Sequence, residues 1–294
     1  MIGASHSQTQ SSVSSELDTD ISRATAGEAG WDPQGLSGPS RSTIARTVSS
    51  TTSGHPVGST GVSAPNSSDG NNGSAMGSYY IKTFTGDGSV STSGWPPMDK
   101  WISFDSFWEL NVHVMKQSCK NWDMSLVQNS DKEIEEIRKS IEKMAAETRL
   151  DKTFIAAIMM QESNGCTRVH TTVLTHPNPG LFQSHDGTGS CHDRPSGPCP
   201  QEDIFQMVKD GVGGTSQGDG LKQCLEKSRD GHSVGEDGAV PYYRAARLYN
   251  SGSPGPDGDL GREGATPCYC SDVANRLIGW TLGNSGCTSE AVLL

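Results

Sequence analysis

The stretch Thr153-Phe-Ile-Ala-Ala-Ile-Met-Met-Gln-Glu-Ser-Asn-Gly165 decides the fold of this chain. Its unbroken apolar run, 154–160, leaves the segment apolar nearly all round, which is typical of a helix buried at the centre of a domain. Gly165 is a residue suited to cap the end of such a helix. We therefore predict a central helix over 153–162 that ends at 163–165.

Glu162 is the residue of this helix that could carry chemistry. It follows Ile158 by four residues and Met159 by three, so its carboxyl group shares a face with core residues. It also lies at the helix C-terminus, where the macrodipole disfavours a negative charge. Both effects raise its pKa, and a carboxyl group that is protonated near neutral pH can serve as a general acid. The alternative is a Glu that extends into solvent from a frayed helix end.

Other segments also carry helix signals. Ser130 and Glu133 form a capping box in front of an apolar stripe over 134–145. Further helices are expected at 101–115, 202–210, 221–227 and 240–249, and from an N-cap at Asp272 through Trp280. Strand alternation is weak, with one candidate at 169–174 and a return pairing near 181–182. We predict a mainly α fold.

The composition divides the chain in two. Residues 1–97 contain 22 Ser, 11 Thr and 14 Gly and no Cys, so they cannot bury enough apolar surface to offset the entropy of ordering. We expect a disordered Ser/Thr/Gly-rich tail or linker over 1–97. A single domain is expected over 98–294, which is long enough for one sizeable core.

The net charge of the chain limits which classes of molecule it can bind. The formal net charge is −11, which argues against a nucleic-acid partner, and Arg244 and Arg247 are expected to lie on a solvated helix face. The longest apolar run, 154–160, is too short to cross a membrane. We expect a soluble chain.

Eight Cys, all between Cys119 and Cys287 and without a Cys-x-x-Cys pair, indicate a set of disulfides and an oxidising compartment. Cys268 and Cys270 are too close in sequence to pair with each other, so each is expected to pair elsewhere. We expect secretion. No signal peptide is visible in residues 1–16, so the export signal lies upstream, has been removed, or is unconventional.

Three ordered motifs extend this interpretation: Gln161-Glu162-Ser163-Asn164-Gly165, Pro179-Gly180-Leu181-Phe182-Gln183, and Ala245-Ala246-Arg247-Leu248-Tyr249-Asn250-Ser251-Gly252. In order and spacing they resemble the Glu-Ser-Gly, Gly-Leu-Met-Gln and Ala-Tyr-Asn-x-Gly motifs of soluble lytic transglycosylases and goose-type lysozymes. The resemblance covers about half of the chain and is closest to secreted fungal proteins with this domain. It implies a lysozyme-like helical fold, stabilised here by disulfides.

The resemblance also implies roles for single residues. Glu162 matches the catalytic acid. Ser163, Gln183, Tyr249 and Asn250 match substrate-binding positions, and Phe182, where Met is commoner, would keep an apolar wall. The insertion of Asn164 between Ser163 and Gly165 is a departure from the short form of the first motif.

Two further site questions stay open. Asp186 and Asp193 are the nearest candidates for a second carboxylate, although the sequence favours a loop-capping role for each. Without a second carboxylate, the substrate's own acetamido or hydroxyl group would complete the reaction. His170, His176, His185 and His192, with Cys191, could indicate a metal, but no His pair has helical ligand spacing. We predict no metal or other cofactor. Substrate contact is expected of His170 or His185, and the alternative is that these are solvated loop residues.

From the sequence we expect a secreted, monomeric enzyme that cleaves β-1,4-linked amino-sugar polymers, with peptidoglycan as the first candidate substrate and chitin oligomers as the close variant. The reaction is either hydrolysis, as in a muramidase, or lytic transglycosylation. The alternative of another class is a non-catalytic glycan-binding or effector module that has kept the fold; a structural surface protein is a third.

Overall fold

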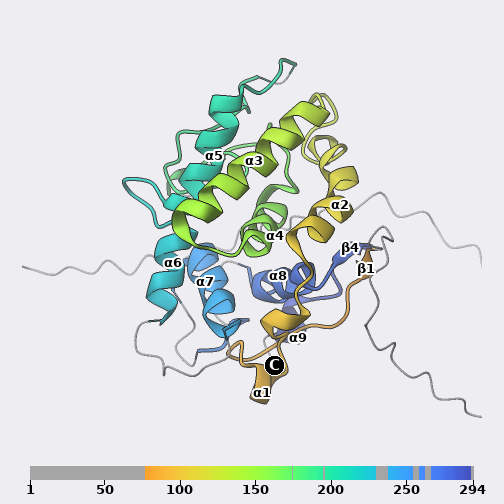
Figure 1. The fold of residues 1–294 in the computed structure, drawn as a ribbon, viewed down its shortest axis with the longest axis vertical. Coiled ribbons are helices and arrows are strands. Elements are labelled where there is room, and N and C mark those ends of the chain that lie inside the picture. Colours follow the sequence, from red (N-terminus) through yellow and green to blue (C-terminus); the bar gives the residue numbers. More distant parts are fainter. Residues whose placement is uncertain are drawn as a thin grey trace, which may run out of the picture. The chain divides into compact units, whose positions relative to one another are not determined.

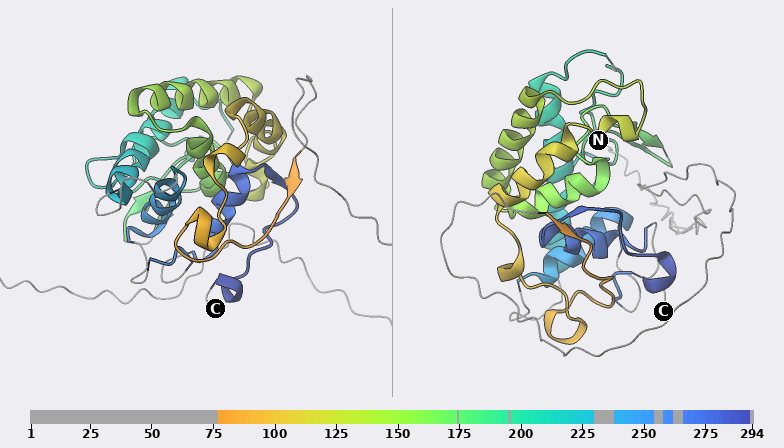
Figure 2. Two further views of the ribbon diagram at one scale, coloured as in Figure 1. Left: turned by 60° about the horizontal axis from the view of Figure 1, so that its bottom comes forward. Right: turned by 90° about the vertical axis from the view of Figure 1, so that its right-hand side faces the viewer.

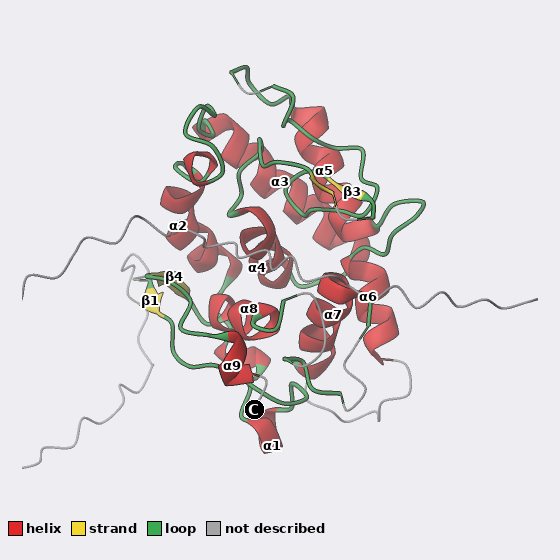
Figure 3. Ribbon diagram, turned by 180° about the vertical axis from the view of Figure 1, so that it is seen from behind, coloured by secondary structure: helices red, strands yellow, loops and turns green. Residues whose placement is uncertain are grey.

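The computed structural model describes residues 77–173, 175–194, 196–229, 238–253, 258–261 and 266–292. All of them belong to one unit of the chain, Trp31–Leu294, and they are mainly helical (Figure 3). Residues 1–76 of the expected tail lie outside the described residues. The elements in chain order are β1 (Ser78–Tyr79), α1 (Val90–Ser93), η1 (Met98–Lys100), α2 (Phe104–Met115), η2 (Cys119–Asn121), α3 (Asp131–Thr148), α4 (Lys152–Ser163), β2 (Thr172–Val173), β3 (Pro177–Asn178), α5 (Gln201–Gly213), α6 (Leu221–Arg229), α7 (Val240–Ser251), α8 (Tyr269–Leu277), β4 (Trp280–Leu282) and α9 (Ser289–Val292).

The central helix predicted from the sequence is α4, and every residue from Thr153 to Ser163 is buried. It packs against α2, α3 and α8, so that other helices surround it (Figure 1). The Asp151 side chain caps its N-terminus by accepting a hydrogen bond from the Phe154 amide at 2.9 Å. At the other end Asn164, not Gly165, is the C-cap residue, with φ 51°. Gly165 follows with φ 72°, so two successive left-handed residues end the helix.

The capping box of α3 is confirmed, because the Ser130 and Glu133 side chains each bond the other's backbone amide. Helix α3 packs on α5, and α6 packs on α7. Glu133 does more than cap the helix. Its Oε1 atom lies 2.5 Å from Nη2 of Arg168 and accepts the Cys199 amide at 2.8 Å. Arg168 is 1% exposed, so α3 holds a buried ion pair that joins it to two later loops.

The strands are few and short in the described chain. β2 pairs antiparallel with β3, Thr172 opposite Asn178. The expected return pairing at 181–182 was therefore wrong, because the chain turns back four residues earlier. β1 pairs parallel with β4, which joins the two ends of the described chain (Figure 2).

The packed part of the chain begins before the expected boundary at Met98. Phe84 and Trp95 are buried in the core, and the Trp95 ring lies 4.8 Å from that of Tyr243 on α7. The Tyr80 hydroxyl lies 2.8 Å from the Ser271 hydroxyl on α8. Segment 77–97 therefore belongs to the folded unit in spite of its Ser- and Gly-rich composition, since a few aromatic residues anchor it.

Three disulfides are present, Cys119–Cys166, Cys191–Cys199 and Cys268–Cys287. The expectation that all eight Cys pair was wrong, because Cys224 on α6 and Cys270 on α8 are free and buried. Both lie in the apolar core, where a thiol packs as a small hydrophobic group.

Two more expectations from the sequence need correction. Helix α8 begins at Tyr269, ahead of the predicted cap at Asp272, and Trp280 lies in β4. Arg247 is fully buried, and its Nη1 donates to the Thr266 carbonyl at 3.3 Å, so it does not lie on a solvated face. None of the described helices is long and apolar enough to cross a membrane.

Candidate active site around Glu162

Glu162 lies on the last turn of α4 and is 8% exposed. Burial raises the pKa of its carboxyl group to about 7, and a hydrogen bond from Tyr269 opposes part of that rise. The alternative of a solvent-exposed Glu at a frayed helix end was therefore wrong. Close to neutral pH this carboxyl group populates both of its protonation states, as a general acid and base requires.

Two tyrosines accompany the Glu162 carboxyl group. The Tyr269 hydroxyl, on the first turn of α8, donates to Glu162 Oε1 at 2.5 Å. The Tyr249 hydroxyl, on α7, donates to the Phe182 carbonyl at 2.8 Å. Burial raises both tyrosine pKa values well above the usual range, and the negative charge of Glu162 adds to the rise in each. Both phenols thus stay neutral and act as hydrogen-bond donors.

Tyr269 was not singled out from the sequence. The sequence nevertheless contains a pattern that includes this residue. Tyr269, Val273 and Leu277 recur at four-residue spacing and form a buried stripe of α8. That stripe predicts that the ring is buried. Its partner could not be predicted, because the bond to Glu162 spans 107 residues of chain.

Behind this helix end lies a buried polar network. Gln161 Oε1 accepts from Arg276 Nε at 2.9 Å, and Gln161 Nε2 approaches Asp272 Oδ2 at 3.5 Å. Burial raises the pKa of Asp272, and the positive charge of the nearby Arg276 guanidinium reduces that rise. These contacts join α4 to α8 beside the Glu162–Tyr269 bond.

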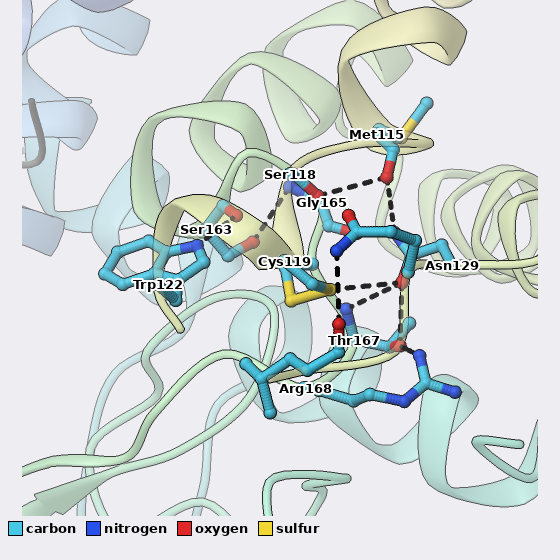
Figure 4. The surroundings of a disulfide bond; sticks show 12 residues. Met115, Ser118, Cys119, Trp122, Asn129, Ser163, Gly165, Thr167 and Arg168 are labelled. Atoms are coloured by element: carbon cyan, nitrogen blue, oxygen red, sulfur yellow. Dashed lines mark hydrogen bonds between the residues drawn. A yellow bond between two sulfur atoms is a disulfide. The ribbon is translucent and has the colours of Figure 1, made fainter. Parts of the chain in front are cut away.

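Ser163 does not lie where the sequence interpretation placed it. It is fully buried, and its hydroxyl donates to the Leu181 carbonyl at 2.8 Å and accepts from the Gly165 amide at 3.1 Å. Its own carbonyl accepts from the Trp122 indole at 3.2 Å (Figure 4). The Ser163 side chain therefore positions the loop that carries Leu181 and is not presented to a ligand.

Phe182 is also fully buried, contrary to the expectation of an apolar wall facing substrate. Its ring packs on Gly211 of α5, where an added Cβ would lie 2.3 Å from Phe182 Cβ. Gln183 is half-buried, with φ 46°. Its amide donates to the carbonyls of His170 and Gly180 at 3.2 and 3.0 Å and accepts from Thr172 at 2.9 Å. All of these bonds are within the protein, so Gln183 orders the loops beside the site.

Asn250 and His170 are the two remaining residues that the motifs and the sequence placed at a binding site. Asn250 follows Tyr249 on α7, and its buried Oδ1 has no hydrogen-bond partner among the described residues. His170 is half-buried, with its ring 4.7 Å from that of His192. His170 is partly exposed, whereas the Asn250 Oδ1 atom is enclosed by the protein.

Neither candidate for a second carboxylate is among the groups that shift the pKa of Glu162. Asp193 is exposed. Asp186 faces two imidazoles, with Oδ2 3.2 Å from His176 Nδ1 and 3.7 Å from His185 Nε2. In the described chain the pKa of Glu162 responds to burial and to Tyr269, with no carboxylate among the causes. The site therefore contains one carboxyl group that is hydrogen-bonded by Tyr269 and is close enough to Tyr249 to raise the pKa of that phenol.

A hollow of about 400 Å³ lies at the opposite end of α4, lined among others by Trp101, Asp105 and Lys152. Because α4 rises about 1.5 Å per residue, this hollow is about 15 Å from Glu162 and does not include it.

Comparison of the chain with protein-family models, with curated proteins and with solved structures found no match.

Proposed function

We propose that this chain is a lysozyme-like, secreted enzyme that cleaves β-linked amino-sugar polymers, with peptidoglycan as the first substrate to test and chitin oligomers as the second. One observation carries the proposal. A buried carboxyl group with a pKa of about 7 ends the central helix and receives a hydrogen bond from a buried tyrosine. The order of the three motifs around Glu162, Gln183 and Tyr249 supports the same class of reaction.

In this proposal Glu162 acts first as an acid. Its proton passes to the glycosidic oxygen, the bond from that oxygen to the anomeric carbon breaks, and positive charge develops on the sugar ring. Glu162 is then a carboxylate, and the Tyr269 hydroxyl stabilises that charged form by donating to it. The carboxylate next removes a proton, either from an attacking water or from a hydroxyl group of the same sugar.

The proposal assigns one acid/base, Glu162, and names no second catalytic carboxylate. A pair of catalytic carboxylates would be separated by about 5–5.5 Å for retention or about 6.5–9.5 Å for inversion. Lytic transglycosylation, in which the substrate supplies the attacking hydroxyl, needs one acid/base only.

The proposed partner is an extracellular polysaccharide, and three disulfides are compatible with that location. An acidic chain gains no electrostatic steering towards an anionic cell wall. Binding would therefore depend on polar and apolar contacts with the sugar and not on the net charge of the chain.

A second candidate is a glycan-binding or effector module without turnover. The low exposure of Glu162 and the internal hydrogen bonds of Ser163 and Gln183 favour it. In that case the Glu162–Tyr269 bond only joins α4 to α8.

The test is mass spectrometry of products after incubation with purified peptidoglycan and with chitin oligomers. The proteins are the wild type, Glu162→Gln, and a matched control, Glu136→Gln. Glu136 is also 8% exposed but lies on α3 and contacts Lys139 at 3.3 Å.

Soluble fragments from the wild type and from Glu136→Gln, but not from Glu162→Gln, support the enzyme. Anhydro ends would indicate the lytic route, and reducing ends hydrolysis. If no protein yields products from either polymer, the enzyme proposal is rejected, and binding to the polymer by the folded wild type then favours the second candidate. Equal amounts of product from all three proteins would reject the catalytic role of Glu162.

A further inference from the structure

Three potential metal ligands converge beside the β2–β3 hairpin, outside the site described above. His176, in the turn between β2 and β3, and His185 and Asp186, in the loop after Gln183, each offer one ligand atom. These three atoms all lie within 4.8 Å of one another. The two imidazole rings lie 4.3 Å apart between centroids. We propose that His176, His185 and Asp186 bind a divalent transition-metal ion of the zinc class.

The distances suit such an ion. Two ligands bonded at about 2.0–2.1 Å to a tetrahedral centre lie roughly 3.3 Å from each other. Asp186 Oδ2 is 3.2 Å from His176 Nδ1 and 3.7 Å from His185 Nε2. The carboxylate is therefore already at ligand spacing from the first imidazole, and small side-chain rotations would bring in the second.

The donor set selects the kind of ion. Two imidazole nitrogens and one carboxylate oxygen suit zinc and its neighbours, whereas calcium and magnesium prefer oxygen ligands throughout. The three side chains are 49%, 40% and 28% exposed. A bound ion would thus have protein on one side and an open position for water on the other.

The backbone holds the three ligands in place. The Asp186 amide donates to the Pro177 carbonyl at 2.9 Å, which ties its loop to the hairpin that carries His176. The His185 carbonyl accepts from Thr215 at 2.8 Å. Gly218 lies against the same residue, where an added Cβ would be 2.6 Å from His185 Cβ. The site therefore draws on three chain segments that are already in contact, the hairpin, the loop of His185 and Asp186, and the loop that contains Thr215 and Gly218.

An ordinary ion pair is the competing explanation for this cluster. One protonated imidazole would suffice to neutralise Asp186, yet nitrogen atoms of two rings approach the same carboxylate oxygen. An ion that accepts electron pairs from all three groups accounts for both approaches. It would clamp the hairpin to the loop that follows Gln183.

The chain contains a matched control pair. His170 and His192 also place two imidazole rings 4.7 Å apart, and no carboxylate of the described residues is grouped with them as a ligand. The test therefore compares the full wild-type chain with His185→Gln, Asp186→Asn and the double variant His170→Gln/His192→Gln. Asp186 has φ 49°, and Asn tolerates that backbone conformation well, so Asp186→Asn is expected to keep the fold.

Zinc affinity is measured by competition with a chromogenic chelator, and visible absorption of added Co²⁺ reports the coordination. We expect one ion per wild-type chain, with affinity reduced about tenfold or more in His185→Gln and Asp186→Asn and unchanged in the control pair. Zinc should raise the melting temperature of the wild type and the control, but not of the two ligand variants. Equal zinc affinity in wild type and ligand variants, or an equal loss in the control, would overturn the proposal in favour of an ion pair alone.

Discussion

The hydroxyl group of Tyr269, on the first turn of α8, donates a 2.5 Å hydrogen bond to Oε1 of Glu162, on the last turn of α4. This bond joins two helices that are far apart in sequence and places a neutral donor on a carboxyl group that burial pushes towards protonation. The acidity of Glu162 is thus set by a balance between desolvation and a single phenol.

Tyr269→Phe is expected to raise the pKa of Glu162 further above about 7, because the bond from Tyr269 favours the charged carboxylate. It should also lower the free energy of unfolding by about 1–3 kcal/mol above neutral pH, where the carboxylate loses its donor. Carboxyl-carbon NMR titration measures the pKa. Tyr249→Phe is the control, since that hydroxyl donates to the Phe182 carbonyl. Equal Glu162 pKa values in the two variants would contradict the assignment.

Glu162→Gln is expected to make the protein more stable than the wild type at alkaline pH. The pKa of Glu162 is about 7 in the folded chain and close to 4.5 in the unfolded chain. Its protonated form therefore stabilises the fold fully below pH 4.5, and this contribution is lost as the pH rises through 7. Over that window the wild type loses about 3 kcal/mol that the variant does not lose.

Urea unfolding of both proteins at pH 5 and pH 8 tests this expectation. Glu135→Gln is the control, because Glu135 is exposed on α3. A difference between wild type and Glu162→Gln that is the same at both pH values would show that Glu162 does not titrate in this range.

The sequence indicated some of these features and not others, for physical reasons. The burial of Glu162 could be predicted because it follows from local spacing, with Ile158 and Met159 on the same face of one helix. The capping box at Ser130 and Glu133 is local in the same way. The Glu162–Tyr269 bond depends on how α4 packs against α8, and no periodicity in either helix specifies that contact.

The residues assigned from the motifs show a second limit of sequence-based prediction, which concerns the orientation of side chains. A motif states which residue types occur together, but not where each side chain points. The Ser163 side chain faces inward because its hydroxyl donates to the Leu181 carbonyl. The Phe182 ring faces inward because Gly211, which has no side chain, leaves room for it. The grouping of His176 with Asp186 depends likewise on a backbone bond between the Asp186 amide and Pro177.

Glu133→Gln is expected to lower the free energy of unfolding at neutral pH by about 3–5 kcal/mol, because it leaves the buried Arg168 guanidinium without its charge partner. Glu135→Gln, two residues away and exposed, should change it by less than about 0.5 kcal/mol. Hydrogen bonds from Ser130, Cys199 and Arg168 hold the pKa of Glu133 below its usual value. Its contribution is therefore present above pH 4.5 and is lost on acidification. Urea titrations at pH 7 and pH 4 check both statements, and equal effects of the two variants would refute them.

The three disulfides should differ in their contribution to stability. Cys119–Cys166 encloses 47 residues and Cys191–Cys199 encloses 8. In the chain-entropy account the longer loop contributes about 4 kcal/mol and the shorter about 2.5 kcal/mol. Cys119→Ala/Cys166→Ala should therefore lower the melting temperature more than Cys191→Ala/Cys199→Ala.

The longer bridge also supports more of the described structure. Its surroundings contain the Asn129 amide, which donates to the Met115 and Gly165 carbonyls at 2.9 and 2.7 Å (Figure 4). Loss of the bridge should loosen the end of α4 that carries Glu162, so the Glu162 titration should broaden or shift in this double variant alone. Thiol counting provides the internal check, because Cys224 and Cys270 are buried. Wild-type protein should react at neither thiol when folded and at both when denatured. A smaller decrease in melting temperature on loss of Cys119–Cys166 than on loss of Cys191–Cys199 would refute the entropic ordering.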